Sequence, residues 1–185
     1  WQQVDGTRRS NVTKVPVLLL AGWYDPFLQT QLDDFKALNS HADASVSKQS
    51  RLIIGPWGHA KNVFFPDGSS TENFRFVSMA SSFDWFDRHL KGRKVVQTSP
   101  VRIFVMGDNR WRDEQTWPLP RAVNTKLFLQ SDGNAADPSG DGQLLLEAPF
   151  DTHTPDVFTY NPLNPVPTRG GAFMGPGMAI KQQNT

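Results

Sequence analysis

RLIIGPWGH, residues 51–59, is the stretch that decides the fold, because an apolar run ends there at Gly-Pro and a histidine follows. The aliphatic residues 52–54 predict a short buried strand, and Gly55 with Pro56 predicts its end. His59 should then lie just past the carboxyl end of this strand. Open α/β sheets place their functional residues at that edge.

A second stretch, VPVLLLA at residues 15–21, has the same design. Its apolar residues predict another buried strand, with Pro16 tolerated near the start, and Asp25 follows shortly after the strand. If the two strands are parallel neighbours, Asp25 and His59 should lie side by side. A carboxylate behind a histidine fixes the imidazole tautomer and stabilises the imidazolium. The chain order acid then histidine matches the order Ser…Asp…His of α/β hydrolases, so we expect a nucleophile upstream of residue 1.

The residues alone leave structural alternatives open for both side chains. His59 could be a core histidine that is satisfied by a backbone carbonyl, and Asp25 could form a turn before Pro26. The other three histidines have simpler interpretations. His89 falls on a predicted helix, and His41 and His153 lie in a polar loop and in the β region.

Helical and strand periodicities divide the chain into two regions. Apolar residues at three- and four-residue spacing predict helices over residues 27–38 and 76–90, with Gly92 as a C-terminal stop. Residues 39–50 read as a polar loop. From residue 99 onward the period changes to two, and short strands are expected at residues 101–106, 126–130, 143–147 and 156–160. Short strands between Gly- and Pro-rich turns predict a β-sandwich.

Composition excludes several classes of function. The 185 residues carry 19 basic and 18 acidic side chains, which gives no indication of a nucleic-acid partner. No apolar run approaches the ~20 residues of a membrane span. The absence of cysteine excludes disulfides and thiolate metal sites in this segment. We expect no metal and no cofactor. The compartment is undecided, with the cytoplasm favoured, and the absence of Met at residue 1 suggests that the native N-terminus lies elsewhere.

Five short motifs, in order along the chain, resemble those of the CocE/NonD hydrolases, a family of esterases and acylases that includes, more distantly, X-Pro dipeptidyl peptidases. They are Gly22-Trp23-Tyr24-Asp25, Gly55-Pro56-Trp57-Gly58-His59, Phe86–Gly92, Val105-Met106-Gly107 with Arg110-Trp111-Arg112, and Pro165–Thr168 with Gly170-Gly171. The resemblance runs from about Trp1 to about Gln183. It implies an α/β fold: the C-terminal part of an α/β-hydrolase domain over residues 1–98, then the start of a jelly-roll β-sandwich over residues 99–185.

The resemblance also implies a function. Asp25 and His59 would belong to a Ser-His-Asp triad that cleaves a small-molecule ester or amide, with the serine upstream, because no Gly-x-Ser-x-Gly occurs in residues 1–185. Residues 1–185 alone are therefore expected to be inactive. The predicted substrate-binding residues are Phe27, Trp57, Phe173 and Met174, for which ordinary core packing is the alternative. A homo-oligomer is compatible with the sequence.

Two other functions remain open at this point. α-Amino-acyl substrates are disfavoured, because the acid is followed by Pro26, Phe27 and Leu28 instead of further carboxylates. One alternative is an X-Pro dipeptidyl peptidase, which would need an acidic site for a free N-terminus, and the sequence shows no such site. The other alternative is a non-catalytic jelly-roll protein that binds carbohydrate, since a fold does not fix a function.

Overall fold

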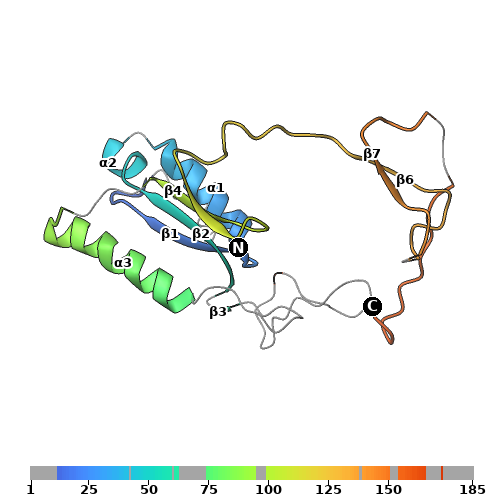
Figure 1. Cartoon of the computed structure of the whole chain (residues 1–185), viewed down its shortest axis with the longest axis horizontal. Coiled ribbons are helices and arrows are strands. Elements are labelled where there is room, and N and C mark those ends of the chain that lie inside the picture. Colours follow the sequence, from blue (N-terminus) through green and yellow to red (C-terminus); the bar gives the residue numbers. More distant parts are fainter. Residues whose placement is uncertain are drawn as a thin grey trace. The chain divides into compact units, whose positions relative to one another are not determined.

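Two parallel strands, β1 (Leu18–Tyr24) and β2 (Arg51–Gly58), lie side by side in the larger sheet of the computed structural model (Figure 1). Their register runs from Leu18 opposite Arg51 to Gly22 opposite Gly55. The predicted parallel pairing is therefore confirmed. Because the two strands run in the same direction, their carboxyl ends lie at the same edge of the sheet.

The structure describes most of the chain, in segments with gaps between them: residues 12–41, 43–59, 61–62, 74–94, 99–137, 139–150, 154–165 and 172. The chain divides into two compact units. The first holds residues 1–120 and 169–181, and the second holds residues 121–168 and 182–185.

Three further strands complete the sheet of the first unit: β3 (Lys61–Asn62), β4 (Val101–Val105) and β5 (Arg110–Glu114). The strand order is β1-β2-β4-β5, and β3 pairs with β2. β4 is parallel to β2, whereas β5 is antiparallel to β4. β4 thus joins the sheet of β1 and β2, although the sequence suggested a separate sandwich from residue 99. A period of two predicts a strand but does not indicate which sheet it joins. The predicted domain boundary at residues 98/99 stays a prediction.

One face of this sheet is the core of the first unit. Helix α1 (Leu28–Asn39) covers that face with Leu32 and Phe35, which are 8% and 0% exposed. Side chains from alternate positions of three strands meet them: Ala21, Leu52, Ile54, Val101 and Ile103. Alternation places residues i and i+2 of a strand on the same face, so every second residue of β1, β2 and β4 contributes to this core.

Strand β2 continues through Gly55-Pro56, where the sequence predicted its end. The β1–β2 register shifts between the pairs Gly22–Gly55 and Tyr24–Gly58. One residue of β1 there faces two residues of β2, and Pro56 is one of those two. A bulge is one of the few places in a sheet that tolerates proline, because the missing N–H leaves no ladder bond unmade. The predicted stop was wrong for this reason, and the strand ends at Gly58, directly before His59.

Helix α3 (Phe74–Lys91) lies beside β1 and confirms the predicted helix (Figure 1). It ends at Lys91, and Gly92, the next residue, has φ +64° as expected for a left-handed C-terminal stop. Its apolar stripe is exposed, with each side chain between 53% and 76% accessible in the structure: Phe76, Met79, Phe83, Phe86 and Leu90. Partly buried residues such as Trp85 and His89 lie on the other side of the helix. The most apolar face of α3 is thus not the face that packs on the described sheet.

The second unit contains a two-stranded antiparallel sheet of β6 (Phe128–Gln130) and β7 (Gln143–Leu145). Both strands were predicted, at slightly greater length. Residues 156–160 were also predicted as a strand, but they have no regular structure. Their alternating apolar pattern has no partner strand among the described residues to complete a ladder. Helix α2 (Ala44–Ser47) was missed because it is only one turn long and lies in a polar loop.

Candidate active site

Asp25 is held at the end of β1 by the turn that leads into α1. Its N–H donates to the carbonyl oxygen of Gly22 at 3.0 Å, and its own carbonyl accepts from the N–H of Leu28 at 3.1 Å. The residue is only 7% exposed. A buried carboxylate needs partners for its oxygens, and each of the two oxygens has one.

The two carboxylate oxygens of Asp25 have different partners. Oδ1 accepts a hydrogen bond from the backbone N–H of Phe27 at 2.9 Å, and Oδ2 lies 3.3 Å from Nδ1 of His59. The expectation that Asp25 and His59 lie within hydrogen-bond range is confirmed. Because an ionised carboxylate can only accept, Nδ1 must carry the proton in this pair. Nε2 of a neutral His59 then has a free lone pair and can accept a proton.

His59 follows β2 directly and is much more open than its partner. Its side chain is 44% exposed, against 7% for that of Asp25. The imidazole ring also contacts the ring of Phe27 in an edge-on arrangement, with 5.2 Å between centroids and 73° between planes. A buried acid behind a half-exposed imidazole is the geometry in which the imidazole can reach a reacting group while the acid holds its tautomer.

Trp57, predicted as a substrate-binding residue, is buried in the structure. It is 1% exposed and packs against Trp111 of β5, with 5.8 Å between ring centroids. A Cβ at Gly55 would lie 2.2 Å from the Trp57 ring, and one at Gly22 would lie 2.1 Å from the Trp57 carbonyl oxygen. The two glycines therefore make room for Trp57 at the bulge before Asp25 and His59. This placement matches the core-packing alternative.

The structure describes only some of the remaining predicted site residues and histidines. Phe27 lies against His59 and is 45% exposed. Phe173 and Met174 lie outside the described residues, as does His153. The Nδ1 atom of His41 accepts from the N–H of Asp43 at 3.0 Å, which supports its reading as a loop residue. The ring of His89 contacts that of Trp85 in α3 at a tilt of 49°, with 4.2 Å between centroids.

The sequence interpretation missed one contributor at this edge of the sheet. It is the Phe27 N–H, although an aspartate followed by proline often bonds the N–H two residues later, as in an Asx turn. Tyr24, the last residue of β1, precedes Asp25, and burial raises the pKa of its hydroxyl above the ordinary value.

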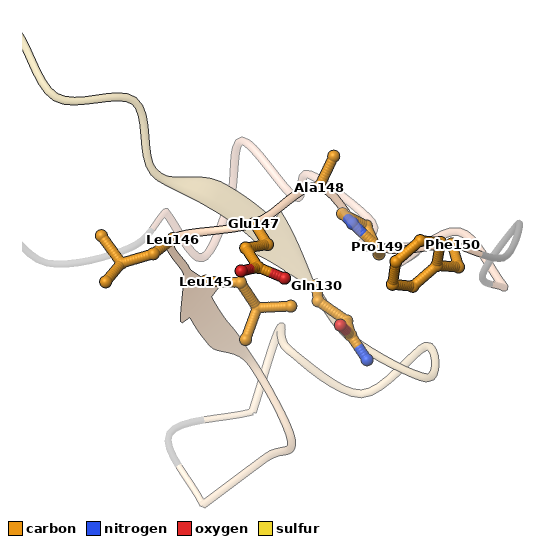
Figure 2. Close-up of a pocket in the computed structure, with 7 residues that line it drawn as sticks. All are labelled: Gln130, Leu145, Leu146, Glu147, Ala148, Pro149 and Phe150. Carbon is orange, nitrogen blue, oxygen red and sulfur yellow. The ribbon is translucent and has the colours of Figure 1, made fainter.

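The second unit contains a hollow of its own, of about 530 Å³ (Figure 2). It is lined by residues of β6 and β7 and by the segment that follows them: Gln130, Leu145, Leu146, Glu147, Ala148, Pro149 and Phe150. The predicted site residues that the structure describes, Asp25, Phe27, Trp57 and His59, do not line it. In the described part of the chain, no three His, Cys, Asp or Glu side chains are grouped as metal ligands would be. Within the same residues, no helix has both the length and the apolar character needed to cross a bilayer.

Comparison with known proteins agrees with this geometry. Residues 1–61, which include Asp25 and His59, match the family model for X-Pro dipeptidyl-peptidase (S15 family). Residues 93–182 match the model for the X-Pro dipeptidyl-peptidase C-terminal non-catalytic domain. The chain is also 35% identical to cocaine esterase of Rhodococcus sp. (strain MB1 Bresler) over 182 residues, which is 94% of this chain and 30% of that protein.

The chain belongs to the cocaine esterase and X-Pro dipeptidyl-peptidase (CocE/NonD) family. This confirms the resemblance that the sequence motifs indicated. The chain spans about a third of the length of cocaine esterase. The two matched regions correspond to an α/β part and a following β part.

A solved structure shows the same fold. An aminopeptidase from the marine sediment archaeon Thaumarchaeota archaeon superposes with a TM-score of 0.60 over 72% of this chain and 23% of that protein, at 21% sequence identity. This similarity concerns the fold alone, because the identity is low. A mixed α/β architecture is therefore supported both by the strands and helices of the structure and by a solved relative.

Proposed function

We propose that this chain supplies the acid and the general base of a serine hydrolase that cleaves acyl esters or amides. The observation that carries the proposal is the pairing of Asp25 Oδ2 with His59 Nδ1 at 3.3 Å, past the ends of two parallel strands. Membership of the CocE/NonD family supports it. So does the location of both residues in the region that matches the S15 peptidase model and not in the one described as non-catalytic.

The proposed roles follow from the chemistry of the pair. Asp25 keeps the proton of His59 on Nδ1, so that Nε2 can take the proton of a serine hydroxyl as the hydroxyl attacks the acyl carbon. His59 then returns this proton to the leaving alkoxide or amine, and the acyl group stays on the serine. A water molecule, activated in the same way, releases the acid. The serine and the oxyanion-stabilising donors are proposed to lie upstream of residue 1, in an α/β-hydrolase domain that precedes a jelly roll.

The substrate is proposed to carry a neutral or apolar acyl group. The residues that follow the acid, Pro26, Phe27 and Leu28, bring no charge to the site, and the ring of Phe27 is half exposed beside His59. Phe27 is proposed to contact the acyl group. Phe173 and Met174 are proposed as further pocket residues on the family resemblance alone.

A second candidate is X-Pro dipeptidyl-peptidase activity, because both matched family models carry that name. The two functions require different substrates. The whole protein that contains this chain should be assayed with 4-nitrophenyl butyrate and with glycyl-prolyl 4-nitroanilide at equal concentrations. The proposal expects a higher kcat/KM for the ester. Selective turnover of the dipeptide anilide would favour the peptidase, and turnover of neither would contradict both.

A further inference from the structure

A general base must have its accepting nitrogen aimed at the proton it takes, and one hydrogen bond does not aim an imidazole. The bond from Nδ1 of His59 to Oδ2 of Asp25 is 3.3 Å long, beyond the usual range for N–H···O bonds. It fixes one atom of the ring, around which the ring plane can still turn. The side chain is also 44% exposed, so that packing restrains it on only part of its surface.

Phe27 supplies a second contact to each member of the pair. Its backbone N–H donates to Oδ1 of Asp25 at 2.9 Å, which sets the plane of the carboxylate and leaves Oδ2 for the histidine. Its ring meets the imidazole edge-on, with centroids 5.2 Å apart and planes at 73°. Aromatic rings at such distances and angles have a preferred mutual orientation, so this contact restricts rotation of the imidazole about its bond to Asp25.

Phe27 is itself well anchored. It directly precedes α1, and its carbonyl oxygen accepts from the N–H of Gln31 at 3.1 Å, in the first turn of that helix. The helix is fixed to the sheet by Leu32 and Phe35 in the core. The backbone of Phe27 therefore cannot shift without disturbing α1, and the ring rests on a rigid support.

We infer that Phe27 is a positioning residue for the Asp25–His59 pair: its N–H orients the carboxylate and its ring holds the imidazole plane so that Nε2 stays aimed at the nucleophile. This inference deepens the proposed function and rests on it for its kinetic consequences. It assigns Phe27 a task beyond contact with the acyl group. The ring is 45% exposed, so one part of it can face a substrate while another part touches His59.

The two tasks of Phe27 predict different kinetics. A residue that only lines the acyl pocket should matter more as the acyl group grows. A residue that positions His59 should matter equally for every ester, because the same proton transfer occurs in each. Misplacement of a catalytic group by about 1 Å can cost on the order of 10²-fold in rate.

The experiment compares Phe27→Ala, Phe27→Leu and Phe27→Tyr with the wild type in the whole protein, with circular dichroism to establish folding. For 4-nitrophenyl acetate and 4-nitrophenyl benzoate alike, Phe27→Ala should lower kcat by about 10- to 100-fold, with little change in KM for the acetate. The kcat of Phe27→Leu should lie between those of the wild type and Phe27→Ala, since leucine keeps apolar bulk but lacks the planar ring. Phe27→Tyr keeps the ring and should retain most of the wild-type kcat.

An activity-independent signal separates this inference from the proposed function. In protein labelled with ¹⁵N-histidine, the His59 resonances, assigned by their loss in His59→Ala, should show a single Nδ1–H tautomer in the wild type and in Phe27→Tyr. In Phe27→Ala the same tautomer should persist, because Asp25 still accepts the Nδ1 proton, but the His59 ring resonances should broaden as the imidazole turns about that bond. Equally sharp His59 ring resonances in Phe27→Ala, with a loss of rate that grows from acetate to benzoate, would overturn the positioning role. If the wild type hydrolyses no ester, the proposed function fails, and the line widths of the His59 ring still decide whether Phe27 positions His59.

Discussion

Oδ2 of Asp25 and Nδ1 of His59 lie 3.3 Å apart, although 34 residues separate them in the chain. The parallel pairing of β1 with β2 brings them together, since it places the carboxyl ends of both strands at one edge. Asp25 is buried and His59 is half exposed. The pair thus has one member that is shielded from water and one that can reach a reacting group.

The carboxylate of Asp25 should be essential for rate but not for folding. In Asp25→Asn the side-chain oxygen can still accept the N–H of Phe27, so the turn should remain. The amide can, however, donate to Nδ1 and stabilise the wrong tautomer of His59. We expect kcat for an aryl ester to fall by on the order of 10³-fold or more. Asp33→Asn is the control, because Asp33 is exposed on α1 beside Lys36, and it should leave kcat unchanged.

Gly55 should not tolerate a side chain while Trp57 is present. Its Cβ would lie 2.2 Å from the buried Trp57 ring, so Gly55→Ala should lower the free energy of unfolding by about 1–3 kcal/mol. The loss should be smaller in a Trp57→Leu background. Gly22→Ala is the comparison, because its Cβ would meet the Trp57 carbonyl oxygen at 2.1 Å as well as the Trp57 side chain at 2.6 Å, and Trp57→Leu leaves the backbone clash in place. Urea unfolding followed by circular dichroism measures five variants: Trp57→Leu alone, and Gly55→Ala and Gly22→Ala each with and without Trp57→Leu. Equal losses for Gly55→Ala in both backgrounds would contradict the packing.

His89 should make stability depend on pH. Burial lowers the pKa of His89 from its ordinary value of 6.5, and the nearby charge of Arg88 lowers it further. Its Nε2 is buried and has no hydrogen-bond partner among the described residues. Because the folded state disfavours the protonated ring, the unfolded chain binds more protons near this pH. The contribution of His89 to the free energy of unfolding is therefore fully present above pH 6.5. It is lost as the pH falls from 6.5 through the lowered pKa of the folded state.

The check is urea unfolding at pH 7.5 and pH 5.5 of wild type, His89→Gln and His41→Gln. His89→Gln should lose less stability between the two pH values than the wild type does. His41→Gln keeps His89 and should behave like the wild type. An identical pH dependence in wild type and His89→Gln would show that the burial of His89 has no such effect.

The exposed apolar stripe of α3 should bind a hydrophobic dye in the 185-residue chain. Five large apolar side chains on one helix face, each more than half exposed, form a patch of a kind that monomeric proteins rarely leave open. Replacing Phe83 and Phe86 together by Gln should reduce the fluorescence of bound anilinonaphthalene sulfonate. Val123→Gln removes one exposed apolar side chain of the second unit and should change it little. If both variants bind dye like the wild type, the stripe is not the binding surface.

Much of the fold could be predicted because local pattern and tertiary structure agree. The aliphatic runs before Asp25 and His59 became β1 and β2, and the helical spacing gave α1 and α3. The parallel pairing then followed from general rules for α/β sheets, and with it the contact between Asp25 and His59. Wherever a side-chain pattern was strong and its partner element was near in the chain, the prediction was confirmed.

The failures have physical causes that a single sequence does not reveal. β5 was missed because four of its five residues are charged, so it shows no apolar alternation. The tolerance of β2 for Pro56 depends on a bulge in β2 itself, where two of its residues face one residue of β1. The burial of Trp57 depends on the missing side chains of Gly22 and Gly55. The spacing in α3 predicted an amphipathic helix, but spacing does not tell which element covers which face.

Whether His59 is the general base is decided by kcat of His59→Ala in the whole protein. The measurement is steady-state hydrolysis of an aryl ester by this variant, beside His41→Ala and His89→Ala, with circular dichroism to show that each is folded. Without its general base, His59→Ala should lose on the order of 10³-fold or more in kcat. His41→Ala should keep its rate, and any loss in His89→Ala should appear first in thermal stability. A folded His59→Ala protein that keeps more than about a tenth of the wild-type kcat would contradict general-base catalysis by His59.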